Sequence, residues 1–380
     1  MDILLPEETS PTGLILSGGG ARAAYQVGVL RAIADILPGD AVNPFRVIAG
    51  TSAGALNAVT LASHAKRFRF AVKRLEFVWK HLSSEQVYDP QSGGLLGGAS
   101  SVLLAMLGNK TNDKPVALFD NAPLAGLLSR VVRFDRLQHN VDVGLLDAIS
   151  VTASAYGTGE SVFFYQGIKS IDDWTGPHRL GRRATLQLQH LMASSAIPIV
   201  FPSVQIDDQY YGDGAVRQLA PTSTAIHLGA RRLLAIGVSG NRSKPPAEAL
   251  QQEAPGLMHI IGHILNSAFV DTLENDLEFL RHMNDVIPHI AEKQKKRLSR
   301  PVYEVELLEI SPSKELNLLA MEYYDELPRP LSRYIKKSGS GTMLSLILFE
   351  KGFCSALLEL GYADAMAKER DIRRFFGCWD

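Results

Sequence analysis

The chain has 380 residues, an apolar fraction of 46%, a charged fraction of 21% and a formal net charge of −1. These values are typical of a folded protein with a large core, in one domain or one domain with an appendage. A net charge near zero excludes a molecule-wide attraction to nucleic acid or acidic lipid. The two cysteines, Cys354 and Cys378, form neither a disulfide framework nor a metal-ligand pattern.

The first twelve residues carry Asp2, Glu7 and Glu8 and lack the basic start and apolar core of a signal peptide. No stretch reaches the roughly eighteen uninterrupted apolar residues of a membrane-spanning helix. We therefore expect a cytoplasmic protein whose membrane contact, if any, is peripheral, with no nucleic-acid partner. The sequence does not indicate an oligomeric state.

Short apolar strands alternate with helical patterns in the first 240 residues. In chain order we predict a strand at 13–17, a helix through 25–36, a strand at 45–49, helices at 53–63 and 70–82, paired strands at 149–156 and 161–166, a helix at 186–196, a hairpin at 204–211 and a strand at 232–239. This alternation predicts an α/β layer fold with a mainly parallel sheet.

The composition and the apolar pattern of the sequence change after residue 240. Residues 241–256 are polar and contain prolines, which is typical of a linker. Apolar residues then recur at helical spacing up to Pro288, a strand follows at 302–310, and 343–376 is mostly helical. We predict a first domain at 13–240, a linker at 241–256 and a mostly helical extension at 257–380.

The most informative pattern is GTSAG at residues 50–54, placed between a predicted strand and a predicted helix. A sharp strand-to-helix turn holds its serine in a cramped conformation, so the positions two before and two after it, Gly50 and Gly54, must lack side chains. The hydroxyl of Ser52 then lies at the positive end of a helix, where it can act as a nucleophile.

Acyl transfer also needs donors for the oxyanion and a base. The run Gly18-Gly19-Gly20 follows a strand and opens a helix, so consecutive backbone N–H groups can converge on one anionic oxygen. For the base, the residues leave two possibilities: the histidines, or Asp213 in the tripeptide Asp213-Gly214-Ala215 after the predicted hairpin. An aspartate is a weak base unless it is desolvated and within hydrogen-bond distance of the serine.

Four motifs together resemble the patatin-like phospholipase family. They are LSGGGARAAYQVGVL from residue 16, GTSAG from residue 50, ASSAIPIVFP from residue 193 and Asp213-Gly214-Ala215. Their order and rough spacing match the family over about residues 13–240. The chain departs from the family pattern at Ser17 and Ala23, and the segment after Ala215 is a looser match.

The resemblance implies a three-layer α/β/α core and a lipid acyl ester hydrolase of the phospholipase A or lysophospholipase kind, without a metal or other cofactor. It implies a Ser-Asp dyad, with Ser52 as nucleophile and Asp213 as base. The amides of Gly18, Gly19 and Gly20 form the oxyanion hole, and Arg22 lies nearby to steady it or a phosphate. The expected partner is the lipid substrate.

Other interpretations of the same residues stay open. Ser52 could be a simple helix cap and Asp213 a hairpin-turn residue, which would leave a non-catalytic lipid-binding module on the same fold. Gly18-x-Gly20-x-x-Ala23 satisfies a dinucleotide-binding pattern and suggests an oxidoreductase, but no acidic residue closes the second strand. A Ser-Asp-His order through His227, His259 or His263 is also formally available.

The segment Gly93–Leu107 is apolar and rich in glycine. Two structures fit this composition equally well: a flap that covers the site or enters lipid, and a buried loop with a helix.

Overall fold

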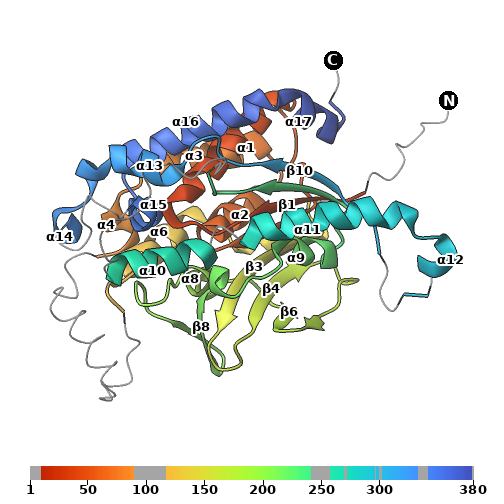
Figure 1. Cartoon of the computed structure of the whole chain (residues 1–380), viewed down its shortest axis with the longest axis horizontal. Coiled ribbons are helices and arrows are strands. Elements are labelled where there is room, and N and C mark those ends of the chain that lie inside the picture. Colours follow the sequence, from red (N-terminus) through yellow and green to blue (C-terminus); the bar gives the residue numbers. More distant parts are fainter. Residues whose placement is uncertain are drawn as a thin grey trace.

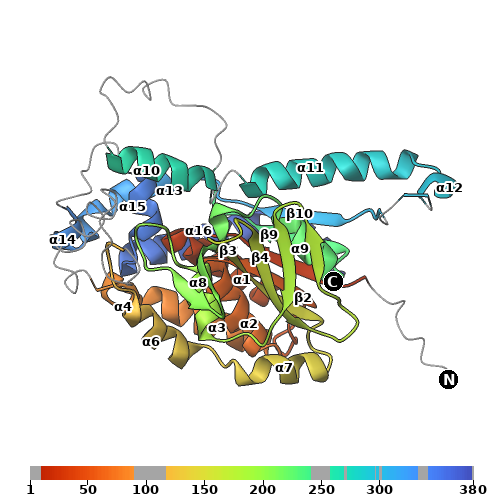
Figure 2. The same cartoon turned by 90° about the horizontal axis from the view of Figure 1, so that it is seen from below.

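The computed structural model of the chain describes residues 10–89, 117–240, 257–268, 272–295, 297–298, 302–332 and 341–378. Within these residues one ten-stranded sheet runs through the molecule, with helices on both of its faces (Figures 1 and 2). The predicted linker at 241–256 and the segment Gly93–Leu107, for which a flap and a buried loop with a helix were both expected, lie outside the described residues.

The sheet has a parallel half and a mostly antiparallel half. Its order is β10-β9-β1-β2-β3-β4-β6-β5, and β8 pairs with both β3 and β7. All pairs from β10 to β3 are parallel, whereas β3–β4, β3–β8, β5–β6 and β7–β8 are antiparallel. The strands are β1 Thr12–Leu16, β2 Val47–Thr51, β3 Ala148–Ala155, β4 Ser161–Gly167, β5 Trp174–Gly176, β6 Arg179–Arg183, β7 Val204–Ile206, β8 Gln209–Asp213, β9 Arg232–Ile236 and β10 Glu306–Ile310.

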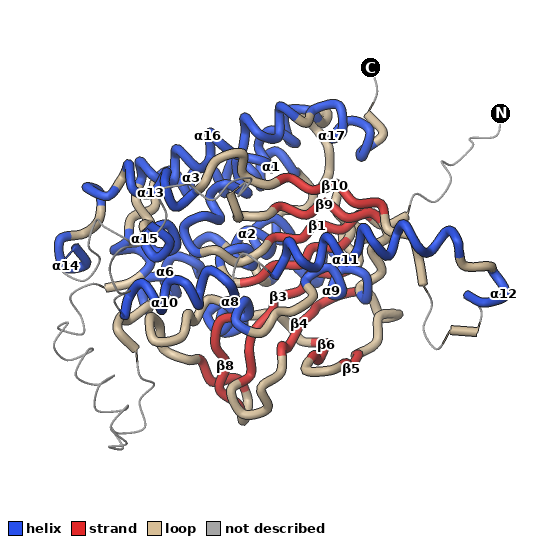
Figure 3. Tube along the Cα trace, viewed as in Figure 1, coloured by secondary structure: helices blue, strands red, loops and turns tan. Residues whose placement is uncertain are grey.

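The described helices differ widely in length and cover the sheet unequally (Figure 3). They are α1 Ala24–Ile36, α2 Ala53–Ser63, α3 Phe68–Lys80, α4 Ser84–Val87, α6 Ala122–Val131, α7 Asp135–Asp142, α8 Leu188–Ser194, α9 Pro221–His227, α10 Leu257–Asn266, α11 Thr272–Val286, α12 Glu292–Lys295, α13 Leu316–Glu322, α14 Arg329–Ser332, α15 Gly341–Ile347, α16 Lys351–Ala367 and α17 Glu369–Phe376. Short 3-10 turns at Gly20–Ala23 and Gly214–Val216 follow β1 and β8.

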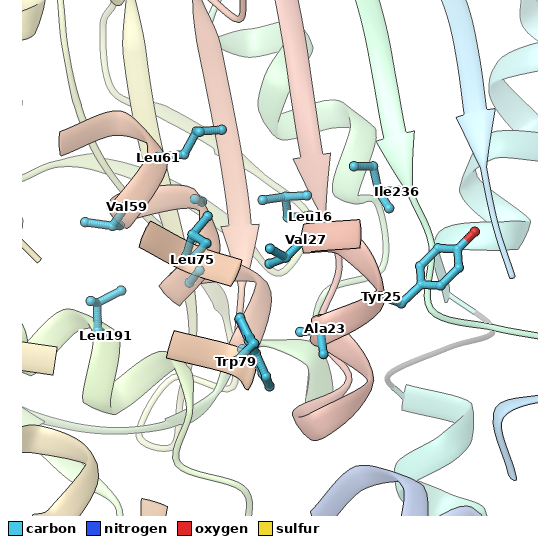
Figure 4. Close-up of a cluster of buried hydrophobic side chains, with 14 of the residues drawn as sticks. Leu16, Ala23, Tyr25, Val27, Val59, Leu61, Leu75, Trp79, Leu191 and Ile236 are labelled. Carbon is cyan, nitrogen blue, oxygen red and sulfur yellow. The ribbon is translucent and has the colours of Figure 1, made fainter. Parts of the chain in front are cut away.

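Two apolar clusters separate the three layers. The larger cluster lies between one face of the sheet and helices α1, α2, α3 and α16, and Figure 4 shows part of it, with Leu16, Val59, Trp79 and Ile236 among its side chains. The smaller cluster covers the other face and joins strand residues to α9 and α11. The predicted three-layer α/β/α fold, mainly parallel at its centre, is therefore confirmed.

The C-terminal part contributes more to this core than its sequence predicts. Strand β10 pairs with β9 in parallel and extends the sheet, and α11 helps to cover the second face. Helix α16 lies along α1, where Gly28 and Gly361 allow close approach: a Cβ at Gly28 would lie 2.0 Å from the Leu358 carbonyl oxygen. Residues 257–378 thus include part of the main sheet as well as helices around it.

Some predicted elements change in detail. Within the described residues, the apolar pattern at 257–287 forms helices α10 and α11. The hairpin at 204–211 is present as β7 and β8. The short helices α6, α7 and α9 were not predicted, because seven to ten residues span too few helical turns to give a clear period.

Candidate active site

The site forms where β2 and β8 meet end to end along β3. Strand β2 runs parallel to β3 and places Thr51 opposite Thr152. Strand β8 runs antiparallel to β3 and places Asp213 opposite Ala153. Because β4 occupies the other side of β3, the C-terminal ends of β2 and β8 approach each other on the same side. The pairing register therefore brings Ser52 and Asp213 together although they are far apart in sequence.

Ser52 occupies the turn between β2 and α2 in a rare backbone conformation, with φ 53° and ψ −130°. Such a conformation costs about 1–3 kcal/mol for a residue other than glycine. A Cβ at Gly50 would lie 2.6 Å from the Ala58 Cβ, and one at Gly54 would lie 2.3 Å from the Leu16 carbonyl oxygen. The crowding expected on both sides of the serine is thus present in the turn.

Asp213 contacts Ser52 directly. Its Oδ2 accepts a hydrogen bond from Ser52 Oγ at 2.6 Å, and its Oδ1 accepts one from the Ala215 amide at 2.9 Å. The side chain is fully buried, and this burial raises the pKa of Asp213 to about 7 against the lowering effect of both hydrogen bonds. An ordinary surface aspartate, by comparison, is almost fully ionised at that pH.

Sequence reasoning missed the residues that hold the turn in place. The Ser52 amide donates to Ser194 Oγ at 2.9 Å, and Ser194 Oγ donates to the Thr152 carbonyl at 2.5 Å. Thr51 Oγ1 donates to Gln218 Oε1 at 2.6 Å. Ser194 lies within the ASSAIPIVFP motif, and that motif is the sequence feature that could have identified it. Gln218 lies in the segment that matches the family loosely, and nothing in the sequence singled it out.

The glycine run lies next to the serine. Gly20 lines a small cavity together with Ser52 and Ala53. Gly20 and Ala53 each begin a helical turn, and amides in the first turn of a helix have no acceptor within it. Gly20 has φ 55°, and a Cβ there would lie 2.0 Å from the Leu346 carbonyl oxygen of α15. The absence of a side chain makes room for protein backbone at this position.

Two buried polar residues on neighbouring helices hold the glycine loop from one side. Gln26 Nε2 donates to the Ser17 carbonyl at 2.8 Å, and Asn57 Nδ2 donates to the Ala23 carbonyl at 3.0 Å. Asn57 also accepts from Trp79 Nε1 at 2.8 Å. Each is a polar residue among apolar neighbours in the first half of its helix, and this pattern is the sequence feature that could have identified them.

Arg22 holds the glycine loop from the other side. Its buried guanidinium donates to Ser345 Oγ at 2.8 and 2.9 Å, to Asn317 Oδ1 at 2.7 Å and to Asn266 Oδ1 at 3.2 Å. These partners lie in α10, α13 and α15, all within the C-terminal part. The family resemblance implies a place for Arg22 near the predicted oxyanion hole, and in the structure its guanidinium bonds the C-terminal helices.

The cavity beside Ser52 is small and apolar. Its volume is about 50 Å³, whereas pockets for small ligands usually measure about 300–1,000 Å³. Ser52 itself is only 2% exposed, so this conformation is closed around the serine. The wall is formed by apolar side chains of α2, α3, α4, α6 and the segments around α8 and α15, namely Leu56, Trp79, Leu82, Val87, Leu124, Leu127, Leu128, Ile197, Phe201 and Phe349.

The histidines considered from the sequence lie elsewhere or cannot be placed. His227 stacks on Trp174 with ring centroids 5.1 Å apart, and its Nδ1 lies 2.7 Å from the Ser223 carbonyl oxygen. His263 is exposed on α10, and the side chain of His259 lies outside the description.

Among the described residues, no group of three or more His, Cys, Asp or Glu side chains could hold a metal ion. None of the helices in the described ranges is long and apolar enough to cross a membrane.

A known protein family matches this sequence over the residues of the site. The sequence profile described as "Patatin-like phospholipase" matches residues 14–226, which include the glycine run, the turn at Ser52 and Asp213. The chain belongs to the patatin-like phospholipase family.

Among curated proteins, a cGAMP-activated phospholipase of Pseudomonas aeruginosa is 28% identical over 221 residues. That match covers 56% of this chain and 55% of the relative, so the chain spans about half of the relative's length.

Two solved structures are also similar at low identity. VipD from Legionella pneumophila has a TM-score of 0.36 at 13% identity. The match covers 89% of this chain and 67% of the VipD chain. Human GIVD cytosolic phospholipase A2 in complex with methyl gamma-linolenyl fluorophosphonate has a TM-score of 0.43 at 14% identity. The match covers 99% of this chain and 60% of the phospholipase chain.

Proposed function

We propose that the chain hydrolyses acyl esters of lipids, in the manner of a phospholipase A or lysophospholipase, through a Ser52–Asp213 dyad. The observation that carries this proposal is the 2.6 Å hydrogen bond from Ser52 Oγ to a fully buried carboxylate. Family membership supports a lipid ester as the substrate class, and the apolar cavity beside Ser52 supports an acyl chain as the group that enters it.

The reaction needs only groups of this chain and water. Asp213 accepts the Ser52 proton while Oγ attacks the ester carbonyl, and the oxyanion receives hydrogen bonds from backbone amides of the glycine run. The bond between the carbonyl carbon and the alcohol oxygen breaks, and that oxygen takes the proton from Asp213. Water then loses a proton to Asp213 and attacks the acyl-enzyme, and Ser52 leaves with the returned proton.

The environment of Asp213 suits the role of a base. A general base works best when its pKa lies near the operating pH, because it must both hold the correct charge and accept the proton. Burial supplies this match by raising the pKa of Asp213 to about 7. The direct contact with Ser52 removes the need for a histidine between the two residues.

The C-terminal part has a defined place in this proposal. Arg22, two residues after the glycine run, is bonded to Asn317 and Ser345 of the C-terminal helices, and Gly20 lies against the Leu346 carbonyl. We infer that residues 257–378 fix the glycine loop in the conformation that receives the oxyanion. The division into a domain at 13–240, a linker at 241–256 and a mostly helical extension at 257–380 stays a prediction, and these contacts support packing of the extension on the first domain.

The partners of the chain follow from the same proposal. A lipid substrate implies contact with a membrane or a micelle, which we propose to be peripheral. The Pseudomonas relative is named for activation by cGAMP, so a cyclic dinucleotide is an effector class to test on this chain.

The rival functions predict different outcomes. A non-catalytic lipid-binding module predicts lipid binding without product at any substrate concentration. A dinucleotide-dependent oxidoreductase needs space for a pyrophosphate at the glycine run, whereas Gly20 is in close contact with the Leu346 backbone. Binding of reduced NAD(P), followed by its fluorescence, would support that rival.

The test is release of fatty acid from phospholipid and lysophospholipid micelles, measured by mass spectrometry. Wild type should release fatty acid, and Ser52→Ala should not. Ser129→Ala is the matched control, because Ser129 is an exposed serine on α6 that bonds only its own helix, to the Gly126 carbonyl. Equal release by wild type and Ser52→Ala would refute the assignment of the nucleophile.

A further inference from the structure

A second cavity lies at the opposite end of α2 from Ser52. Helix α2 begins after Ser52 and ends at Ser63, so its eleven residues separate the two places by about 16 Å along its axis. The cavity has a volume of about 860 Å³ and lies where the end of α2, the start of α3 and helix α7 meet, all on one side of the sheet (Figure 2). This volume falls within the range of small-ligand clefts.

The charged residues that line this cleft are all basic. Lys66, Arg67, Arg136 and His139 contribute to its wall, and no Asp or Glu does. Within the described part of the chain, no ion pair joins Lys66, Arg67 or Arg136 to a carboxylate. On a protein of net charge −1, such a lining is a local feature that favours an anionic ligand.

A neighbouring basic side chain is used differently. Arg133 forms an ion pair with Asp135 at 3.0 Å. The three cations of the cleft, by contrast, have exposed side chains around one hollow. A phosphate group in the cleft would supply the negative charge that they lack.

The cleft also offers an aromatic surface and polar groups at its floor. Phe70 is 51% exposed, and its ring lies 5.6 Å from that of His64 at an angle of 44°. Asn140 and Ser63 line the cleft and are buried. Burial, together with the positive charges of Arg74, Arg136 and Arg133, lowers the pKa of His64, which is consistent with a positive potential here.

The two helix ends at the cleft act in opposite directions. The end of α2 is unfavourable for an anion, but Asn140 Nδ2 donates to the Ala62 carbonyl at 2.8 Å and the His64 amide donates to the Leu61 carbonyl. The start of α3 is favourable, and its first turn contains no acidic residue. The basic side chains decide the sign of the charge that the cleft attracts.

We propose that this cleft binds a nucleotide, with its phosphate at Arg67 and Arg136 and its base against Phe70, and that the bound nucleotide regulates the site at Ser52 through α2. An anionic membrane is the less favoured occupant, because a membrane at this end of α2 would lie away from the apolar cavity beside Ser52. The regulatory part rests on the proposed hydrolase activity, and the binding part does not.

The first experiment measures binding by isothermal titration calorimetry on the full chain, at about 0.15 M salt to limit non-specific electrostatic attraction. The probes are cGAMP, ATP and inorganic phosphate. We expect at least one nucleotide to bind, and the double variant R67E/R136E to bind it at least about tenfold more weakly, because both charged donors to the phosphate are replaced by carboxylates. Phe70→Ala should weaken binding of the nucleotide about tenfold and leave any binding of inorganic phosphate unchanged.

The matched control is Lys314→Glu, which reverses an exposed charge beyond the end of β10 and outside the cleft lining. It should bind like wild type. Thermal unfolding of each variant checks that the fold is retained. Absence of nucleotide binding by wild type, or equal binding by R67E/R136E, would overturn the proposal. So would sedimentation with phosphatidylserine vesicles that needs Arg67 and Arg136 without any nucleotide binding.

The regulatory part is tested by the rate at which a fluorophosphonate labels Ser52, with and without the bound nucleotide. We expect a change of at least about threefold in wild type and none in R67E/R136E. Nucleotide binding with an unchanged rate would overturn regulation and leave binding. Nucleotide binding by a protein whose Ser52 never reacts would refute the hydrolase and not the cleft.

Discussion

The two ends of helix α2 differ in every property that decides what they bind. At its start, Ser52 and Asp213 are buried beside an apolar cavity of about 50 Å³. At its end, a cleft of about 860 Å³ is lined by exposed basic side chains. The first end holds a serine in a strained turn, hydrogen-bonded to a buried carboxylate, and the second suits reversible binding of an anion. One short helix connects them.

The two ends also differ in how much their features cost the folded state in stability. The turn at Ser52 has a costly backbone conformation, and Asp213 is a buried carboxylate whose ionisation is opposed by desolvation. Neither feature is needed to terminate a strand or start a helix. The cleft end has ordinary backbone and solvated charges. Substitutions should therefore separate the two ends, because in the absence of nucleotide only those at the first end should affect the chemistry.

The largest effect is expected for Ser52→Ala. Removal of Oγ eliminates the nucleophile and should lower ester hydrolysis about 10⁴-fold or more. Binding of nucleotide at the cleft should be unchanged, since the cleft begins at the other end of α2. Hydrolysis is measured as fatty acid release and binding by calorimetry. A variant that loses both would show that the two ends are not separable.

The next effect is expected for Asp213→Asn. The amide retains a hydrogen bond to Ser52 but cannot accept its proton, so hydrolysis should fall about 10³-fold. The same change should stabilise the fold. The pKa of Asp213 is higher in the folded than in the unfolded state, so ionisation of this carboxyl opposes folding. The stability that the protonated carboxyl contributes is therefore lost as the pH rises from about 4 to 7.

At pH 8 the Asp213→Asn variant should therefore be more stable than wild type by roughly 1–4 kcal/mol, and at pH 4 the two should be nearly equal. Denaturant unfolding at both pH values measures this difference. An Asp213→Asn protein that is less stable than wild type at pH 8 would indicate that the carboxylate contributes net stability and is not held at a cost.

The pH dependence of wild type should show the same group. Only the ionised Asp213 accepts the Ser52 proton, so kcat/KM should fall about tenfold per pH unit below an apparent pKa near 7, reaching about 100-fold by pH 5. Initial rates across pH 5–9 on a short-chain ester provide the profile. A flat profile between pH 5 and 7 would be inconsistent with Asp213 as the base.

A smaller effect is expected for Arg22→Lys. Lysine keeps the positive charge but cannot bond Ser345, Asn317 and Asn266 together, so the glycine loop should be held less firmly. We expect kcat to fall about tenfold with little change in KM, because the loop receives the oxyanion and not the ground-state ester. Loss of folding alone would lower the active fraction, which titration with a fluorophosphonate counts separately.

The smallest effect is expected for Ser194→Ala. The Ser52 amide would lose its acceptor, while the dyad and the oxyanion donors remain. A decrease in kcat of about threefold to tenfold is expected from a less firmly held turn. Ser194→Thr retains the hydroxyl and should recover part of the rate if its methyl group fits. Equal rates for Ser194→Ala and wild type would assign this hydroxyl to strand packing alone.

Local patterns predicted the fold class and the positions of the chemistry-bearing residues. The turn at Ser52 and the glycine run are encoded by adjacent residues, so sequence spacing is enough to place them on a strand end and a helix start. The hairpin at 204–211 is local in the same sense. These elements depend on backbone geometry within a few residues.

Long-range contacts could not be predicted from such patterns. The contact of Ser52 with Asp213 depends on the register of β2 and β8 along β3, and the sequence supplied only a family resemblance for it. The bonds of Arg22 reach residues more than 240 positions away. The cleft at Arg67 and Arg136 joins α2, α3 and α7, and α7 was not predicted as a helix.

The most direct test of the central proposal is covalent labelling with a fluorophosphonate, read by intact mass and peptide mapping. The account predicts one adduct on wild type, located at Ser52, no adduct on Ser52→Ala and slow labelling of Asp213→Asn. Lipid vesicles should accelerate labelling of wild type, because the cavity beside Ser52 is closed in this conformation. No adduct on folded wild type with vesicles present, or an unchanged adduct on Ser52→Ala, would contradict it.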